Sequence, residues 1–422
     1  MINLPPPILL KKYIWIAFLL ILALGLYLRF YHIQYIASFG WDQGRDAWVI
    51  RDILHGQFPL QGPRTGVGHM HIGPAYYYLL APFFYLFNLD PMASNYFNII
   101  CVIINLFLIF ISTKTIYNNN AALFATFVYA VSHQMITINQ VPWNVTLMPG
   151  IAALIFLSIF QVYKKKYKWI FLLWILNGFY WNLHFTALFL PVITILSLVF
   201  VKDKMKTLKY SLFSIPLYLM WFVPNILDML HNNSDANLLN DFFKYYYLGF
   251  HLQFLLHRLP DAFIQFSNIF YGIPLPSPNL ILPALFTLVI LFEKNKEKRL
   301  QGYLVLLWFI IPLLGFTLYG GPISDYYFIY TVPMVLYILI YLQQKLLRIN
   351  MLPFLLLLTL FWGFYTYQNT RDLWIKPTSG GLVAKKENVK NLIHHKKKLQ
   401  YEEGNIESYL YTIWVVDRAK IQ

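Results

Sequence analysis

Long apolar runs recur along almost the whole 422-residue chain, and this feature limits the possible folds more than any other. Hydrophobic residues make up 58% of the sequence and charged residues only 12%, whereas soluble proteins carry about 25% charged residues. Many runs approach the roughly 20 residues that a helix needs to cross a bilayer. The runs are continuous, which does not fit the alternating strands of a membrane barrel. We therefore expect an all-α polytopic membrane protein.

About eleven of these segments are expected to cross the membrane. They are residues 13–30, 92–112, 121–138, 146–163, 169–183, 185–201, 210–227, 280–292, 303–318, 326–342 and 351–367. A further segment, residues 74–88, is short and contains two prolines. If it lies at the interface without crossing, lysine-rich loops such as 164–168 and 202–209 fall on the same side as the N-terminus. Cytoplasmic loops carry an excess of Lys and Arg, so we expect this arrangement.

The topology divides the chain into a membrane domain over residues 1–369 and a small extracytoplasmic segment over residues 370–422. The first outer loop is expected at residues 31–91, with interfacial helices. In the C-terminal segment, residues 383–395 predict a short amphipathic helix and residues 408–416 (SYLYTIWVV) predict a strand. This segment is basic, but long tails are translocated largely regardless of charge, so we place it outside.

The net charge of +15 does not indicate nucleic-acid binding, because most Lys and Arg lie in short clusters between apolar runs. Cys101 is the only cysteine, which excludes an intramolecular disulfide and indicates no cysteine metal site. The motifs GxxxxGK[ST], HExxH and GxSxG are absent, so the sequence requires no cofactor and soluble nucleotides are not expected as substrates. Charged residues within the spans are sparse, which speaks against an ion-coupled transporter.

Polar chemistry is concentrated in residues 40–78 of the first outer loop. Asp42, Arg45 and Asp46 recur at three- and four-residue steps, which predicts a helix lying flat at the interface. Asp42 has two interpretations: a helix N-cap with a local ion pair to Arg45, or a functional carboxylate. Asp46 is expected to be an ion-pair partner of Arg45, with a functional role as the alternative.

A glycine-rich stretch of the same loop adds two histidines and an arginine. His69 and His71 are two residues apart, a spacing that could hold a divalent metal together with a nearby carboxylate. Orientation of a polar ligand is the alternative role. Arg64 also has two interpretations, a phosphate contact or a solvated loop residue.

The outer ends of other spans supply further candidate binding residues. One of them is a histidine, His184, and a histidine at such a place suggests function because ionisable groups at membrane depth are costly. The candidates are Trp143, Asn144, His184, Lys244, His257, Arg258, Asp325, Tyr326 and Tyr327. For His184 a satisfied structural histidine is the alternative, and the cations between residues 244 and 258 form a candidate site for an anionic headgroup.

These motifs resemble integral-membrane glycosyltransferases of the GT-C superfamily, related to dolichyl-phosphate-mannose protein mannosyltransferases and to bacterial aminoarabinose (lipid A) transferases. WDQGRDA, residues 41–47, resembles the D-E-x-R-Y-A motif, with Gln43 and Asp46 where Glu and Tyr are common. GPAYYYL, residues 73–79, resembles a K-P-P-L-Y-Y-W segment, with Gly73 where lysine often sits. VPWNVTLMP, LHFTALFLP and DYYFIYTVP resemble later outer segments of the family.

The resemblance implies inverting transfer of a sugar from a polyprenyl-phosphate carrier to a hydroxyl group of a lipid, glycan or protein, at the extracytoplasmic face. It implies that Asp42 is the general base, with Asp46 in reserve. A leaving phosphate needs cationic or N–H donors, and the candidates are Arg64, Lys244, His257 and Arg258. Further candidate substrate contacts are Arg45, His69 and His71. A flippase for a lipid-linked glycan and a non-catalytic membrane scaffold are the alternatives.

Overall fold

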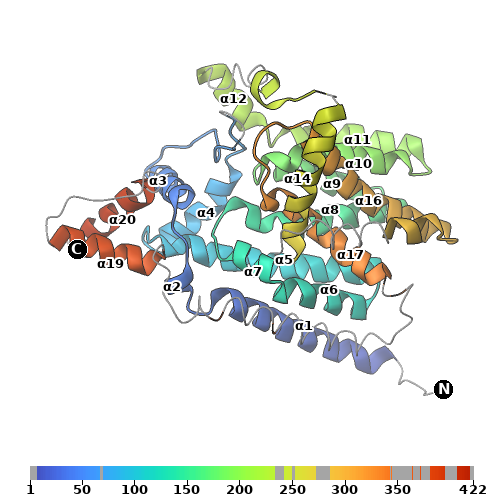
Figure 1. The fold of residues 1–422 in the computed structure, drawn as a ribbon, viewed down its shortest axis with the longest axis horizontal. Helices are drawn as coiled ribbons and strands as arrows, with labels where there is room; N and C mark the ends of the chain where they lie inside the picture. Colours follow the sequence, from blue (N-terminus) through green and yellow to red (C-terminus); the bar gives the residue numbers. More distant parts are fainter. Residues whose placement is uncertain are drawn as a thin grey trace.

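The computed structural model describes residues 7–66, 70–232, 242–249, 252–271, 286–342, 381–394 and 406–418, and the single residues 344, 364 and 371. Within these ranges the regular elements are all helical, apart from three isolated bridges between residue pairs. Figure 1 shows that long helices such as α1 (Pro7–Phe30) run along the long axis of the molecule. The all-α fold expected from the apolar runs is confirmed for the described residues.

Five segments of the described chain are long and apolar enough to cross a membrane. They are α1, α5 (Met92–Ile116), η1 with α8 (Asn144–Leu147 and Met148–Tyr163), α16 (Lys296–Thr317), and η4 with α17 (Asp325–Thr331 and Val332–Leu342). Two bent pairs raise the number to seven if each pair is one span. These pairs are α6 with α7 (Asn119–Val131 and His133–Asn139) and α11 with α12 (Lys204–Leu219 and Val223–Asn232). The chain is therefore an integral membrane protein.

These segments coincide with seven of the eleven spans expected from the sequence. The expected spans 169–183 and 185–201 form the shorter helices α9 (Trp169–Tyr180) and η2 with α10 (Phe185–Leu188 and Phe189–Val199). Of the other two, residues 280–285 and nearly all of residues 351–367 lie outside the described residues. The described chain thus supports five to seven spans directly.

The described part of residues 31–91, where the first outer loop is expected, contains three short helices and a non-helical stretch between them. α2 (Ile33–Ile36) and α3 (Trp41–Leu54) follow α1, and α4 (Ala75–Leu86) precedes α5. With 12 residues at about 1.5 Å each, α4 is about 18 Å long, well under the roughly 30 Å of a bilayer core. This length fits an interfacial position for residues 74–88.

The centre of the bundle is the span formed by η1 and α8. In the most apolar stretch of this span, 94% of the residues are buried. α5, α9 and α17 pack around it. α14 (Leu252–Tyr271) packs against α16 and η4. η3 (Phe242–Tyr246) lies beside the end of α16, where Gly320 N donates a hydrogen bond to the Tyr246 carbonyl at 2.7 Å.

A buried arginine stabilises the 61° bend between α6 and α7. Arg29 of α1 is fully buried and donates hydrogen bonds to the carbonyls of Ala130 (2.5 Å) and Tyr129 (2.9 Å). These carbonyls lie at the end of α6, where a helix leaves its last four carbonyls without intrahelical partners. Arg29 Nε also donates to Asn139 Oδ1 of α7 at 3.0 Å. One side chain therefore joins both arms of the bend, and α7 reaches the candidate site described below.

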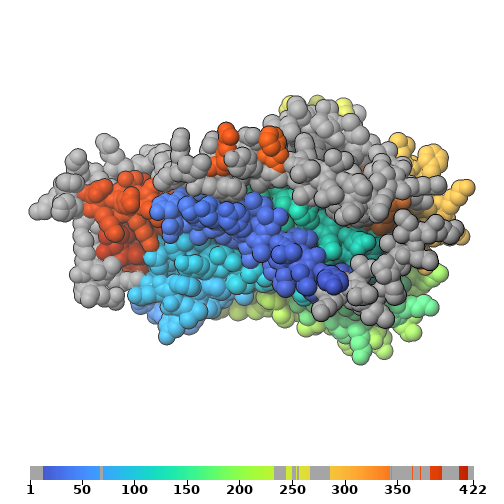
Figure 2. Space-filling model, turned by 90° about the horizontal axis from the view of Figure 1, so that it is seen from below, coloured from blue at the N-terminus to red at the C-terminus, as the bar shows by residue number. Residues whose placement is uncertain are grey.

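The C-terminal residues form two helices that pack against the first outer loop. α19 (Leu382–His394) confirms the expected amphipathic helix, whereas the strand expected at residues 408–416 is wrong, because these residues belong to α20 (Ile406–Arg418). Tyr411, Trp414 and Val415 are spaced as one helical face, and Tyr411 and Trp414 pack against Trp48 of α3. Figures 1 and 2 show the C-terminal helices in red beside the blue and cyan N-terminal part. The tail and the first outer loop therefore lie at the same end of the molecule, as the expected topology requires.

Candidate functional site

An acidic first turn of α3 forms one wall of the candidate site. The N-cap is Gly40, whose backbone N–H donates to Gln43 Oε1 at 2.9 Å. Asp42 therefore lies inside the first turn and is not the N-cap, but the local ion pair to Arg45 that belongs to this interpretation is present. Its Oδ1 accepts a hydrogen bond from Arg45 Nη1 at 2.8 Å, and 52% of its side chain is exposed. A carboxylate at this position is favoured by the helix dipole and open to a ligand.

Asp46 differs from Asp42 in being buried. Its side chain is 5% exposed, and its Oδ1 accepts hydrogen bonds from Arg45 Nη2 (2.7 Å) and Nε (3.0 Å). Tyr77 of α4 also hydrogen-bonds to Asp46. Burial raises the pKa of Asp46 to about 6, although the guanidinium of Arg45 acts in the opposite direction. Arg45 thus bridges an exposed and a buried carboxylate, and its expected pairing with Asp46 is confirmed.

The facing wall is aromatic and comes from η4 and two outer turns. The ring of Trp143 lies 4.8 Å from that of Tyr326. His184 lies 5.6 Å from Tyr326 and 5.1 Å from Tyr327, measured between ring centres. Gln43 Nε2 of α3 donates to the carbonyl of Pro142, next to Trp143, at 3.2 Å, so the acidic helix and this aromatic group belong to one site.

Hydrogen bonds hold the turns of this wall together. Asn144 Nδ2 donates to the carbonyl of Leu183, which joins the turn before α8 to the turn before η2. Asp325 accepts from Gln134 Nε2 of α7 at 2.6 Å and from the backbone N–H of Tyr326 at 2.7 Å. Asp325 therefore anchors the start of η4, and the bend of α6 and α7 brings Gln134 to it.

His184 is buried at the start of η2. Its Nδ1 lies 3.0 Å from Thr186 Oγ1, and burial lowers the pKa of His184 to about 3. The ring is therefore neutral near pH 7 and can orient a polar group by hydrogen bonding, but it does not supply a positive charge.

The glycine-rich part of the first outer loop folds back on itself. Gly62 N donates to the Ile72 carbonyl at 2.8 Å, and an isolated antiparallel bridge joins Arg64 to His71. A Cβ atom on Gly66 would come within 3.3 Å of the Tyr327 hydroxyl, so the loop reaches the aromatic wall. The side chain of Arg64 is exposed, and His69 lies outside the described residues.

His71 contributes to a neighbouring, mainly apolar pocket of about 330 Å³. The pocket is also lined by Trp181, Tyr218, Leu219, Phe222, Asn225, Ile226 and Met229. Asn225 of α12 donates to the carbonyls of His71 and Ile72, both at 3.2 Å, and accepts from Trp181 Nε1 at 3.1 Å. The first outer loop is thereby fastened to α12, with an apolar cavity at the junction.

The described basic residues between positions 244 and 258 occupy different places in the structure. Arg258 donates to the carbonyls of Tyr319 (2.9 Å) and Gly321, and its Nη1 lies 3.5 Å from Asp261 Oδ2. Its guanidinium thus braces the turn that leads into η4. The side chains of Lys244 and His257 are exposed, with the Lys244 ammonium 5.0 Å from the ring centre of Tyr245. The sequence contains no signal that predicts the contact of Arg258 with these distant carbonyls.

Position 73 also has a tight environment. A Cβ atom on Gly73 would lie 2.0 Å from Asn182 Oδ1, the oxygen that accepts a hydrogen bond from Ala75 N at 3.1 Å. A lysine, common at the matching position of the resembled family, does not fit here without movement of Asn182. At this position the loop packs closely against the turn after α9.

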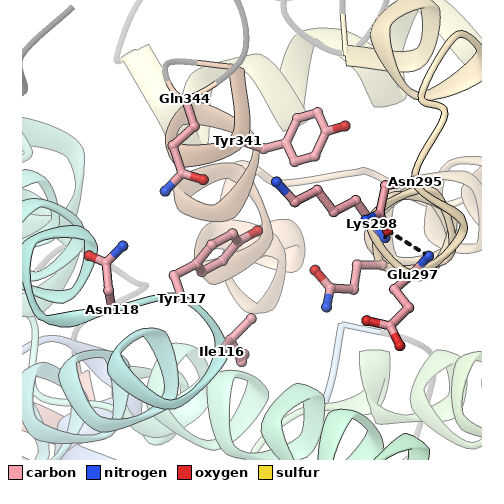
Figure 3. A pocket seen from close by; sticks show the side chains of 9 residues that line it. Ile116, Tyr117, Asn118, Asn295, Glu297, Lys298, Tyr341 and Gln344 are labelled. Carbon is pink, nitrogen blue, oxygen red and sulfur yellow. Dashed lines mark hydrogen bonds between the residues drawn. The ribbon is translucent and has the colours of Figure 1, made fainter. Parts of the chain in front are cut away.

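Among the described residues, no group of three or more His, Cys, Asp or Glu side chains is placed to hold a metal ion. A larger polar pocket of about 530 Å³ lies elsewhere, at the turn between α5 and α6 and the start of α16. Figure 3 shows its lining, including Tyr117, Asn118, Glu297, Lys298 and Tyr341. These residues lie at the opposite ends of α5, α16 and α17 from the acidic helix and η4, so this pocket is separate from the candidate site.

Fold and site together define a polytopic helical membrane protein with a short acidic helix beside a group of aromatic side chains at one end of the bundle. The model of the dolichyl-phosphate-mannose-protein mannosyltransferase family matches residues 71–227. This stretch contains Trp143, Asn144 and His184, whereas Asp42 and Asp46 precede it. No curated protein matches the chain by sequence.

Solved structures share the fold at low sequence identity. ArnT from Cupriavidus metallidurans bound to undecaprenyl phosphate is 12% identical, with a TM-score of 0.55 over 81% of this chain and 61% of that chain. The oligosaccharyltransferase of Archaeoglobus fulgidus in its apo form is 12% identical, with a TM-score of 0.60 over 99% of this chain and 60% of that one. Archaeoglobus fulgidus AglB with an inhibitory peptide and a dolichol-phosphate is 13% identical, with a TM-score of 0.54 over 93% and 60%.

This chain therefore spans about 60% of the length of these proteins. The family match and the shared fold confirm the resemblance to the GT-C membrane glycosyltransferases.

Proposed function

We propose that this protein is a membrane glycosyltransferase that moves a sugar from a polyprenyl-phosphate carrier to a hydroxyl group of an acceptor. The fold and the family match support this class of activity. One of the similar structures contains undecaprenyl phosphate and another a dolichol-phosphate. The observation that carries the proposal is the exposed Asp42 carboxylate, held by Arg45 on a helix whose Gln43 binds the Pro142 carbonyl beside Trp143.

In the proposed reaction the Asp42 carboxylate takes the proton of the acceptor hydroxyl. The acceptor oxygen then forms a bond to the anomeric carbon, and the bond between that carbon and the phosphate oxygen breaks. The electron pair leaves with the polyprenyl phosphate, and the configuration at the anomeric carbon inverts. General-base catalysis of this kind contributes about 10²- to 10⁴-fold to the rate.

Arg45 and Asp46 support Asp42 in this proposal. Arg45 donates to Asp46 from Nε and Nη2 and to Asp42 from Nη1, so Arg45 orients the base. A phosphate would have to compete with two carboxylates for the same cation. We therefore assign Arg45 to orientation of Asp42, and Asp46 to fixing Arg45.

The remaining surfaces suit the other parts of a lipid-linked donor. Trp143 and Tyr326 offer aromatic faces for a sugar ring, and the apolar pocket beside His71 suits an isoprenoid chain. The leaving phosphate develops negative charge, which cationic or N–H donors stabilise. Arg64, Lys244 and His257 are the exposed candidates for this role. We place the site on the extracytoplasmic side, because the Lys-rich loops then face the cytoplasm.

The test is made in proteoliposomes that contain the purified protein and an undecaprenyl-phosphate sugar, for instance the mannose or aminoarabinose derivative, together with an acceptor extract. Release of free undecaprenyl phosphate that depends on the acceptor supports the proposal. Movement of the intact lipid-linked sugar between leaflets, without such release, would instead identify a flippase.

A further inference from the structure

The C-terminal helices join the chain at the residues that lead into α3. Leu382 N donates to the Ala37 carbonyl at 3.0 Å, and an isolated antiparallel bridge pairs Ser38 with Gly381. A segment more than 340 positions away in the sequence therefore holds the backbone just before Gly40, the N-cap of α3.

A buried lysine makes the central contact. Lys385 is 4% exposed, and its Nζ donates to the Phe39 carbonyl at 2.5 Å and to Ser408 Oγ of α20 at 2.7 Å. The ammonium also lies 4.7 Å from the ring centre of Tyr409. Burying an ammonium is costly unless its N–H groups are paired, so the two acceptors fix the place of Lys385 Nζ. The charge fixes the carbonyl directly before the N-cap.

α20 covers the side of α3 that faces away from Asp42. Trp48 contacts Tyr411 at 5.1 Å in a T-shaped arrangement, and Arg51 lies 4.4 Å from the ring centre of Trp48 and 5.8 Å from that of Trp414. At 3.6 residues per turn, Arg51 is about 180° around the helix from Asp42. α19 and α20 thus hold the start of α3 and the side that carries Trp48 and Arg51, and they leave the side with Asp42 open.

We propose that α19 and α20 form a clamp that sets the position of α3, and that Lys385 is a positioning residue for Asp42. The catalytic part of this inference rests on the proposed function. A general base must be held close to its productive position, and an error of 1 Å can lower the rate about 10²-fold. α3 is an interfacial helix of 14 residues, so contacts outside its own backbone have to supply that precision.

The test compares Lys385→Met, which keeps the length of the side chain without its charge, with Lys385→Arg, which restores a cation. Lys386→Met is the matched control, because the neighbouring Lys386 binds Asp90, between α4 and α5, at 2.7 Å. Two readouts are taken on detergent-purified protein: hydrogen exchange of peptides covering residues 38–46, and kcat and KM with the undecaprenyl-phosphate sugar that the wild-type protein uses.

For Lys385→Met we expect at least 10-fold faster exchange in residues 38–46, a kcat at least 10-fold lower and a KM within about twofold of the wild-type value. Lys385→Arg should restore most of the protection from exchange and most of kcat, and Lys386→Met should resemble the wild type. Unchanged exchange in Lys385→Met, or faster exchange with a wild-type kcat, would overturn the positioning role. The exchange measurement needs no turnover, so it decides the clamp even if the protein transfers no sugar.

Discussion

Replacement of Arg29 by methionine tests how the bend between α6 and α7 is held. The substitution removes three hydrogen bonds to other helices, at the carbonyls of Ala130 and Tyr129 and at Asn139 Oδ1. A buried acceptor left unpaired costs about 1–3 kcal/mol. Relaxation and the apolar methionine recover part of this for each of the three acceptors, so we expect the free energy of unfolding to fall by about 3–5 kcal/mol.

The assay is reversible unfolding in mixed micelles, followed by tryptophan fluorescence. Arg29→Lys separates charge from geometry, because an ammonium cannot reproduce the fork of a guanidinium and should recover only part of the loss. Since α7 carries Gln134, which binds Asp325 at 2.6 Å, Arg29→Met should also disturb the start of η4. An unfolding free energy within about 1 kcal/mol of the wild type would refute the view that Arg29 satisfies the broken helix.

Two further predictions concern the loop around the candidate site. The pKa of Asp46 is about 6 in the folded protein, against an ordinary value of 3.8 that applies to the unfolded chain, so its protonation favours the folded state. Stability should therefore decrease as the pH rises from about 4 to about 6, by at most about 3 kcal/mol. Asp46→Asn should flatten this part of the pH profile of thermal unfolding, and an unchanged profile would contradict the assignment. Gly73→Ala places a Cβ atom 2.0 Å from Asn182 Oδ1 and should lower the unfolding free energy by about 1–3 kcal/mol. A melting temperature equal to that of the wild type would show that Asn182 moves freely.

Much of the fold follows from the sequence because its signal is local. Continuous apolar runs predict helical spans, and the spacing of Asp42, Arg45 and Asp46 predicts the helix and its ion pairs. The interfacial segment 74–88 was inferred from the distribution of lysines, and the short α4 fits that inference. These features depend on residues within a few turns of one another.

The features that the sequence does not predict depend on contacts between residues far apart in the chain. Residues 408–416 have the composition of a strand, but packing of Tyr411 and Trp414 on Trp48, more than 360 positions earlier, makes them helical. The contact of Arg258 with the Tyr319 carbonyl and that of Lys385 with the Phe39 carbonyl depend equally on tertiary structure. Backbone carbonyls carry no sequence signature, so side chains that bind them look like free cations in the sequence.

The most direct measurement is the turnover number of Asp42→Asn beside that of Asp52→Asn. Both aspartates lie on α3 and pair with an arginine, Asp42 with Arg45 at 2.8 Å and Asp52 with Arg51 at 2.5 Å. With an undecaprenyl-phosphate sugar and acceptor, Asp42→Asn should lower kcat by about 10²- to 10⁴-fold, the usual contribution of a general base, while Asp52→Asn stays near the wild-type value. Near-normal turnover by a folded Asp42→Asn protein would contradict the assignment of Asp42 as the base.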